Sequence, residues 1–258
     1  MFIQSKLKKY LLQVLVLVFF IFIWWIVVKL FNVSEIIFPS PFRVFRLYAD
    51  HQTLERISLH TWVTLEEALI GFLIGSLIGI ILGYIVVKSK TLENILSPFI
   101  IAAQTTPKLA LAPIFLIWFG FGIISKIFIT ALIVFFPIFI NMAVAIKSIN
   151  PNLREVMQLV RANKWQIFTK LEWPSSLPLL FAGFKSGITL AVVGAVVGEF
   201  VGANSGLGYL IIFSMGHLDT PMVFVAIIQL IVLSIILYEM ISILGTRFMR
   251  WHESEKGS

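Results

Sequence analysis

The sequence contains no cysteine and few charged residues. Its 258 residues include 20 lysines and arginines, 13 aspartates and glutamates, and 4 histidines. Without cysteine there is no disulfide, no thiolate metal site and no thiol nucleophile. The histidines, His51, His60, His217 and His252, lack the spacing of metal ligands, so we expect no metal site. No Gly-Lys-Ser/Thr loop and no nucleophile elbow is present, so we expect no catalytic residues and no ATP hydrolysis by this chain.

The chain is instead rich in long apolar runs. Apolar residues make up 59% of it and the mean hydropathy is +0.98, values outside the range of soluble domains. The net charge of +7 would suit nucleic acid, but the basic residues adjoin apolar runs rather than a soluble domain, so we expect no nucleic-acid partner. The composition predicts an all-α integral membrane protein in contact with lipid.

Apolar runs of about the ~20 residues that a spanning helix needs recur along the chain. They predict about six spans in a single transmembrane domain of residues 1–258, at residues 11–31, 61–87, 98–120, 124–146, 179–201 and 221–247. The first run is longer than the ~7–15-residue apolar core of a signal peptide and lacks a small-residue cleavage site. We therefore interpret it as an uncleaved helix.

Two features of the second span concern packing and charge. Gly71, Gly75, Gly79 and Gly83 recur every four residues, which places them on one helix face suited to close helix packing. Glu66 and Glu67 lie near the start of the span, where we expect solvated interfacial acids rather than the lining of a vestibule.

The third span is interrupted by Pro107 and Pro113, which predicts a broken helix. Lys108 falls about 16 Å into this span, near the bilayer middle, where an ionisable side chain is a candidate for function. A structural ion pair of Lys108 with Glu199 or Glu239 is the alternative. The candidates for a translocation path are Gln104, Thr105, Pro107, Lys108 and Glu199, although Glu199 also suits an interfacial or paired acid.

Residues 147–178, called segment 147–178 below, are the long amphipathic stretch between apolar runs. Apolar residues recur there at helical spacing, with basic residues and Glu155 between them, which predicts short helices that cannot span a bilayer. Asn150 before Pro151 predicts an N-cap, and Trp173 before Pro174 predicts a helix stop. An amphipathic helix lying on anionic lipid is the alternative to a docking role.

Segment 147–178 resembles the Glu-Ala-Ala loop of permease subunits in ABC importers. Glu155 matches the acid of that pattern, Ala162 the alanine after its glycine, Phe168 its aromatic residue, and Pro174 and Pro178 its two prolines. Val156 and Met157 replace the alanines, Arg161 replaces the glycine that permits a bend, and Trp173 replaces a leucine. The resemblance implies a coupling helix that docks on a separate ATPase. The residues we assign to this coupling are Leu153, Glu155, Arg161, Ala162, Trp165, Phe168, Leu171 and Pro174.

Two further stretches, QTTPKLALAPIFLIWFG in the third span and GEFVGANSGLGYLI after the fifth, are similar to the nitrate, sulfonate, taurine and thiamine-precursor branch of these permeases. The resemblance implies the type I importer permease fold, a second permease copy, two cytosolic ATP-binding subunits and an extracytoplasmic substrate-binding protein. ATP and Mg would bind the ATPase subunits, and this chain no cofactor. The substrate would be a sulfonate, nitrate, taurine, or a pyrimidine or flavin vitamin precursor.

The distribution of basic residues predicts the orientation. Six spans with cytosolic N- and C-termini in the cell membrane place most basic residues inside, as the positive-inside rule requires. Those inside are Lys6, Lys8, Lys9, Lys88, Lys90, Lys147, Arg154, Arg161, Lys164, Lys170, Arg247, Arg250 and Lys256, and those outside are Lys29, Arg43, Arg46, Arg56 and Lys126. An ion-coupled secondary transporter is the alternative function, but we see no internal repeat of the kind such carriers often show.

Overall fold

The computed structural model describes residues 2–249, with the side chains of residue 8 and of residues 11–249. This part of the chain is helical and contains no strand, which confirms the predicted all-α class. The elements are α1 (Phe2–Leu30), α2 (Pro41–Leu47), α3 (His51–Lys88), α4 (Lys90–Thr105), η1 (Lys108–Leu111), α5 (Ala112–Phe119), α6 (Ile123–Lys147), α7 (Pro151–Leu159), α8 (Lys164–Ile167), η2 (Phe168–Glu172), α9 (Trp173–Gly202), α10 (Leu207–Gly216) and α11 (Thr220–Phe248). The short η1 is a 3-10 helix and η2 is a π-helix.

Five helices of the described chain are long and apolar enough to cross a membrane, and a sixth span results if α4 and the η1–α5 unit are counted together. These two parts meet at an angle of 85° across the break at residues 106 and 107. The helix break expected from Pro107 and Pro113 is therefore present. The predicted cytosolic placement of Arg250 and Lys256 concerns residues outside those that the structure describes.

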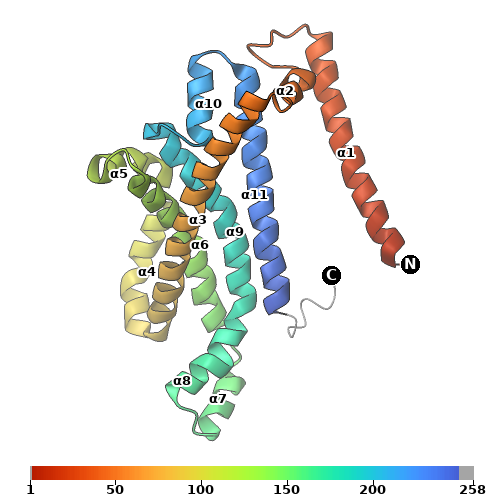
Figure 1. Cartoon of the computed structure of the whole chain (residues 1–258). Coiled ribbons are helices and arrows are strands. Elements are labelled where there is room, and N and C mark those ends of the chain that lie inside the picture. Colours follow the sequence, from red (N-terminus) through yellow and green to blue (C-terminus); the bar gives the residue numbers. More distant parts are fainter. Residues whose placement is uncertain (1, 250–258) are drawn as a thin grey trace.

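The core of the bundle is built from α3, α6 and α9, which pack side by side (Figure 1). The four glycines of α3 face α6, and a Cβ at Gly79 would lie 3.0 Å from the Phe135 carbonyl oxygen. At Gly83 it would lie 2.8 Å from the Phe139 carbonyl oxygen. The glycine face is thus a site of close helix packing, as predicted, because only glycine lets the backbones approach this far.

The helix α1 stands apart from the bundle over most of its length (Figure 1). Its window of highest hydropathy is not buried at all within this chain. It contacts the bundle near its C-terminal end, where the Trp24 ring packs against Phe38 and Phe224 with centroids 5.7 and 5.5 Å apart. Trp24 Nε1 also donates a hydrogen bond to the Pro39 carbonyl at 3.0 Å.

Two helices differ from the sequence expectation at their N-terminal ends. The helix α3 begins at His51, ten residues before the expected span, because Asp50 caps it by accepting a hydrogen bond from the Thr53 N–H at 3.0 Å. The stop expected at Trp173 and Pro174 is wrong, since one helical run continues from Lys164 to Gly202. The π-turn of η2 widens the helix directly before Pro174, and proline is tolerated in the first turn of α9.

The two ends of the bundle carry different elements. Segment 147–178, with α7 and α8, protrudes beyond one end, called the α7–α8 end below (Figure 1). The helices α2 and α10 lie at the opposite end. The candidate site residues are therefore distributed over three places: the protruding segment, the break after α4, and the end near α10.

Candidate functional site

Segment 147–178 folds as two short helices joined by a tight bend. Asn150 caps α7 by accepting a hydrogen bond from the Asn152 N–H at 2.9 Å, with Pro151 in the first turn, as the sequence predicts. Asn163 and Gln166 form a reciprocal capping box that begins α8, with hydrogen bonds of 2.8 and 2.9 Å. Each short helix thus has its own start signal.

The bend between them lies at Arg161, the position where the resembled family has glycine. Arg161 has a φ of +52°, in the left-handed region that favours glycine. Its N–H donates to the Gln158 carbonyl and the Ala162 N–H to the Met157 carbonyl, both at 2.9 Å. This pair of hydrogen bonds is a Schellman motif that ends α7. The arginine therefore adopts the bend that the family pattern requires.

The protruding segment carries exposed apolar side chains from α7 to α8. Leu159 is 81% exposed, Trp165 70% and Val160 68%. Leu153 and Val156 are exposed beside them. We call these five residues the apolar patch. Figure 1 shows α7 and α8 beyond the end of the bundle, and the residues that the structure describes leave these five side chains exposed.

The other predicted coupling residues divide into surface and core positions. Glu155 and Arg161 are exposed, and Ala162 and Pro174 are half-buried. Leu171 is only 8% exposed and belongs to the main hydrophobic core. Phe168 is half-buried and packs against the Tyr84 ring at 5.2 Å between centroids. Leu171 and Phe168 therefore hold the segment to the bundle.

Glu172, which the sequence reasoning missed, is the polar anchor of this segment. It is 1% exposed and accepts hydrogen bonds from the Tyr84 hydroxyl at 2.8 Å and the Lys88 ammonium at 2.6 Å. Arg154 Nη2 lies 3.8 Å from the same carboxylate and donates to the Ile146 carbonyl at 2.9 Å. Glu172, the last residue of η2, thus links η2 to α3 and α7. No local sequence pattern indicated this anchor, because Tyr84 and Lys88 are 88 and 84 positions away from Glu172.

The predicted path residues Gln104, Thr105, Pro107 and Lys108 lie together at the break after α4. Thr105 Oγ1 donates to the Ile101 and Ala102 carbonyls at 3.1 and 3.0 Å. Lys108 is half-buried; its ammonium donates to the Gln104 carbonyl at 2.8 Å and lies 4.7 Å from the centroid of the Phe136 ring. Side chains at the break thus donate hydrogen bonds to its backbone carbonyls.

The alternative of an ion pair for Lys108 is wrong. Among residues 2–249 its ammonium lies within ion-pair distance of no carboxylate, neither that of Glu199 nor that of Glu239. Glu199 is fully engaged elsewhere, and Glu239 is exposed on α11. The ammonium is instead stabilised by a carbonyl oxygen and an aromatic face.

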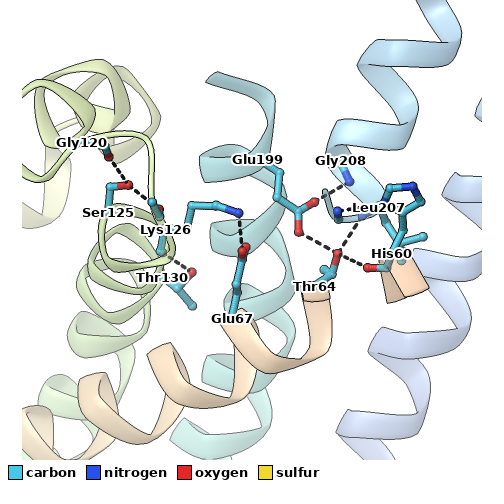
Figure 2. Close-up of polar contacts among 12 residues, drawn as sticks. His60, Thr64, Glu67, Gly120, Ser125, Lys126, Thr130, Glu199, Leu207 and Gly208 are labelled. Carbon is cyan, nitrogen blue, oxygen red and sulfur yellow. Dashed lines mark hydrogen bonds and ion pairs between the residues drawn. The ribbon is translucent and has the colours of Figure 1, made fainter. Parts of the chain in front are cut away.

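Glu199 belongs to a buried network near α10 rather than to the break (Figure 2). It accepts hydrogen bonds from Thr64 Oγ1 at 2.7 Å and from the Gly208 N–H at 2.5 Å. Thr64 Oγ1 accepts one from the Leu207 N–H at 2.8 Å, and His60 Nδ1 accepts one from the Gly206 N–H at 3.0 Å. The network fastens the start of α10 to α3 and α9.

A second buried pair lies beside this network. The Lys126 ammonium of α6 donates to the Glu67 carboxylate of α3, and both residues are at most 5% exposed (Figure 2). The expectation of a solvated acid is therefore wrong for Glu67, although Glu66 is exposed. Lys126, counted among the outer charges, is equally withdrawn from solvent. Glu67 and Lys126 are 59 residues apart in the sequence, so no local sequence pattern indicates that they pair.

No group of three or more histidine, cysteine, aspartate or glutamate side chains that could hold a metal ion occurs in the described part of the chain. The arrangement offers no convergent nucleophile and base either. What it offers is a helical bundle with a broken span, a protruding apolar patch and a buried polar anchor. These features suit transport better than covalent chemistry.

Comparisons with known proteins agree with this interpretation. The family described as "Binding-protein-dependent transport system inner membrane component" matches residues 75–250. The riboflavin transport system permease protein RibX of Chloroflexus aurantiacus is 42% identical over 90% of this chain and 86% of its own. The formylaminopyrimidine transport permease protein ThiX of Halalkalibacterium halodurans is 35% identical over 84% of this chain and 86% of its own.

A solved structure has the same fold. A chain of the MetNI methionine ABC transporter, in an inward-facing conformation, superposes with a TM-score of 0.65 at 22% identity, covering 78% of this chain and 98% of that one. The likeness supports the predicted importer permease fold. On the family match and these relatives together, the chain belongs to the inner membrane components of binding-protein-dependent transport systems and is an ABC importer permease.

Proposed function

We propose that this chain is the transmembrane subunit of an ATP-driven importer that moves a small nutrient by alternating access. The observation that carries the proposal is the apolar patch on the protruding α7 and α8, which the described residues of this permease leave exposed. An exposed patch rimmed by polar residues is typical of a protein-binding surface. Its partner in our proposal is a cytosolic ATP-binding subunit, one for each of two permease copies.

The anchor at Glu172 supports a mechanical role for the segment. A partner that moves α7 and α8 would pull on Glu172, and through its hydrogen bonds on Tyr84 and Lys88 at the end of α3. The same helical run continues into α9. Differential contacts of ATP with the closed and open ATPase pair would supply the free energy for the switch. The N- and C-termini would face the cytosol in the cell membrane, as the basic residues predict.

The break after α4 is our candidate for the translocation path. Irregular backbone at membrane depth is tolerated where it faces protein or water, and Lys108 lies on this break with its ammonium held by a carbonyl. A second copy of the chain would complete the path. Lys108→Met should reduce the uptake rate severalfold while leaving ATPase binding unchanged, and an unchanged uptake rate would assign Lys108 a purely structural role.

For the substrate, the names of the relatives favour a heterocyclic vitamin or vitamin precursor. The riboflavin and formylaminopyrimidine permeases are 42% and 35% identical to this chain, whereas the taurine permease of Escherichia coli is 26% identical. We therefore place a flavin or pyrimidine before a sulfonate, nitrate or taurine. An extracytoplasmic binding protein would deliver it and set most of the selectivity.

The test is purification of the chain in mild detergent from its native membranes, with identification of every co-purifying protein by mass. An ATPase subunit and a binding protein should accompany it. Reconstituted with both, the complex should take up labelled riboflavin or formylaminopyrimidine only when ATP is supplied. Uptake driven by an ion gradient without ATP would overturn the proposal in favour of a secondary transporter.

A further inference from the structure

A basic cavity lies at the α7–α8 end, between the ends of four helices. It has a volume of about 530 Å³ and is lined by Lys88 at the end of α3, Lys90 at the start of α4, Lys147 at the end of α6 and Arg154 of α7. One acid, Glu93, also lines it. Of this lining, the proposed function uses Lys88, through its hydrogen bond to Glu172.

The charges around the cavity do not cancel. Lys147 pairs with Glu93, while Lys88 and Arg154 share the single carboxylate of Glu172. Lys90 is exposed, and its ammonium has no hydrogen-bond or ion-pair partner among the side chains that the structure describes. Four basic side chains thus face two acids, so the cavity carries a net positive charge that suits an anion.

Helix dipoles add little to this field, because they oppose one another here. The N-terminal residues of α4 and α7, Lys90 and Pro151, line the cavity, and so do the C-terminal residues of α3 and α6, Lys88 and Lys147. The positive charge of the cavity therefore comes from its side chains, whose ammonium and guanidinium donors suit a phosphate group.

A second, narrower groove continues from the cavity. It has a volume of about 290 Å³ and shares Val87, Glu93 and Lys147 with the cavity. From there it runs between α4 and α6, mostly along apolar side chains such as Ile100, Phe139 and Ile140, as far as Gln104. Its chemistry changes from charged at the mouth to apolar along its length.

The length of this groove matches one leaflet of a bilayer. From Glu93 to Gln104, α4 rises about 16 Å at ~1.5 Å per residue, which is about half of the ~30 Å hydrocarbon core. Lys88 and Lys147 end their spans at the mouth, where headgroups lie. A free phosphate would use the mouth alone, whereas a phospholipid would use the mouth for its phosphate and the groove for an acyl chain.

We propose that the cavity and groove together bind one anionic phospholipid from the leaflet at the α7–α8 end, with its phosphate between Lys90, Lys147 and Arg154. Basic pockets between helices at the membrane surface are suited to anionic headgroups. Because Arg154 also bonds to the Ile146 carbonyl and contacts Glu172, a lipid here would stiffen the joint between the bundle and α7. The site meets the proposed translocation path at Gln104, where the groove ends.

The test measures binding of spin-labelled phosphatidylglycerol to the full chain reconstituted in phosphatidylcholine vesicles. The double variant Lys90→Gln with Lys147→Gln should weaken binding about 30-fold, from ~1 kcal/mol for each basic residue near the surface. The matched control, Lys164→Gln with Lys170→Gln, removes the same charge from exposed positions of α8 and η2 and should change nothing. Ala143→Phe should block the groove and release the labelled chain.

Several results would overturn the proposal. Spin-labelled phosphatidylcholine held as tightly as phosphatidylglycerol, or equal losses in the control variant, would show unspecific lipid contact. Inorganic phosphate that competes fully, with Ala143→Phe without effect, would assign the mouth to a free anion. Competition by riboflavin would assign it to the transported substrate. Lys147→Gln could perturb folding by leaving Glu93 without its partner. Lys90→Gln alone breaks no hydrogen bond or ion pair of the described residues and should still weaken lipid binding about 5-fold. Unchanged lipid binding in Lys90→Gln would overturn the proposal.

Discussion

The two ends of the molecule hold their buried acids in different ways. Near α10, Glu199 is bonded within the chain to Thr64, and Glu67 pairs with Lys126, which is itself buried. At the α7–α8 end, the buried Glu172 binds Lys88 and Arg154, whose side chains are 40% and 39% exposed. Large apolar side chains are exposed at both ends, so they do not distinguish them. The difference is that the acid at the α7–α8 end is held by cations at the surface, one of them on the protruding segment.

This contrast separates rigid from transmitting parts of the transporter. A charge buried in lipid is costly unless it is paired, so the network near α10 resists rearrangement. The patch on α7 and α8 costs stability in water and makes sense when a partner covers it. We therefore expect substitutions near α10 to change stability, and substitutions in the patch to change partner binding.

The largest effect should come from breaking the Lys126 and Glu67 pair. Lys126→Met leaves the Glu67 carboxylate buried without its cation, which should cost about 3–5 kcal/mol of stability. Thermal unfolding of the purified chain in detergent measures the loss. The double variant Glu67→Leu with Lys126→Met should regain most of it, because neither charge is then buried alone. A double variant as unstable as Lys126→Met would show that the pair is not the unit of stability.

The next effect concerns the patch and should appear mainly in binding. Leu159→Ser with Trp165→Ser removes its two most exposed apolar side chains, which should weaken ATPase binding at least 30-fold if they are hot spots of ~2 kcal/mol or more. Because both side chains are mostly exposed, the unfolding temperature should fall only slightly, by the loss of the Trp165 contact with the Phe168 ring at 5.7 Å between centroids. Gln158→Ala, also exposed on α7, is the matched control. A large drop in stability with binding intact would erase the contrast between the two ends.

A smaller and local effect should follow from Glu172→Gln. The amide keeps the shape but removes the charge that Lys88 and Arg154 share, so a charge-assisted contact worth ~1.5–3 kcal/mol is lost. Hydrogen exchange of α7 should then accelerate by about tenfold or more, while that of α6 stays slow. Equal acceleration in both helices would mean that Glu172 supports the whole bundle rather than the joint.

The spans were predictable because lipid demands long apolar runs, and the helix break because two prolines remove backbone donors within a few residues. The N-cap at Asn150 was predictable because it depends on neighbouring residues in the sequence. The pairs Glu67 with Lys126 and Glu172 with Lys88 were not predictable, because they join residues 59 and 84 positions apart. Such a pair depends on how each helix is rotated about its axis, which packing decides.

The prediction of a helix stop at Trp173 and Pro174 is wrong for a related reason. A proline removes one donor and crowds the preceding turn, which ends an isolated helix. Here the π-turn of η2 changes the hydrogen-bond register directly before it, and Leu171 and Glu172 are buried on the bundle. Tertiary contacts thus maintain a continuous helix where the local pattern predicts two.

The smallest effect should arise at Arg161, and it tests whether the bend itself matters. A non-glycine residue at φ +52° costs ~1–2 kcal/mol, but glycine loses ~0.5–1 kcal/mol more chain entropy on folding. Arg161→Gly should therefore change stability by less than about 1 kcal/mol and keep ATPase binding. Arg161→Val, a β-branched residue that disfavours this region, should loosen the bend and weaken binding severalfold. Arg161→Asn, which tolerates the region, controls for loss of the charge. For each variant we would measure the rate of proteolysis between α7 and α8 and the affinity for the ATPase. Equal results for Arg161→Val and Arg161→Gly would mean that the partner binds the apolar patch without requiring the bend.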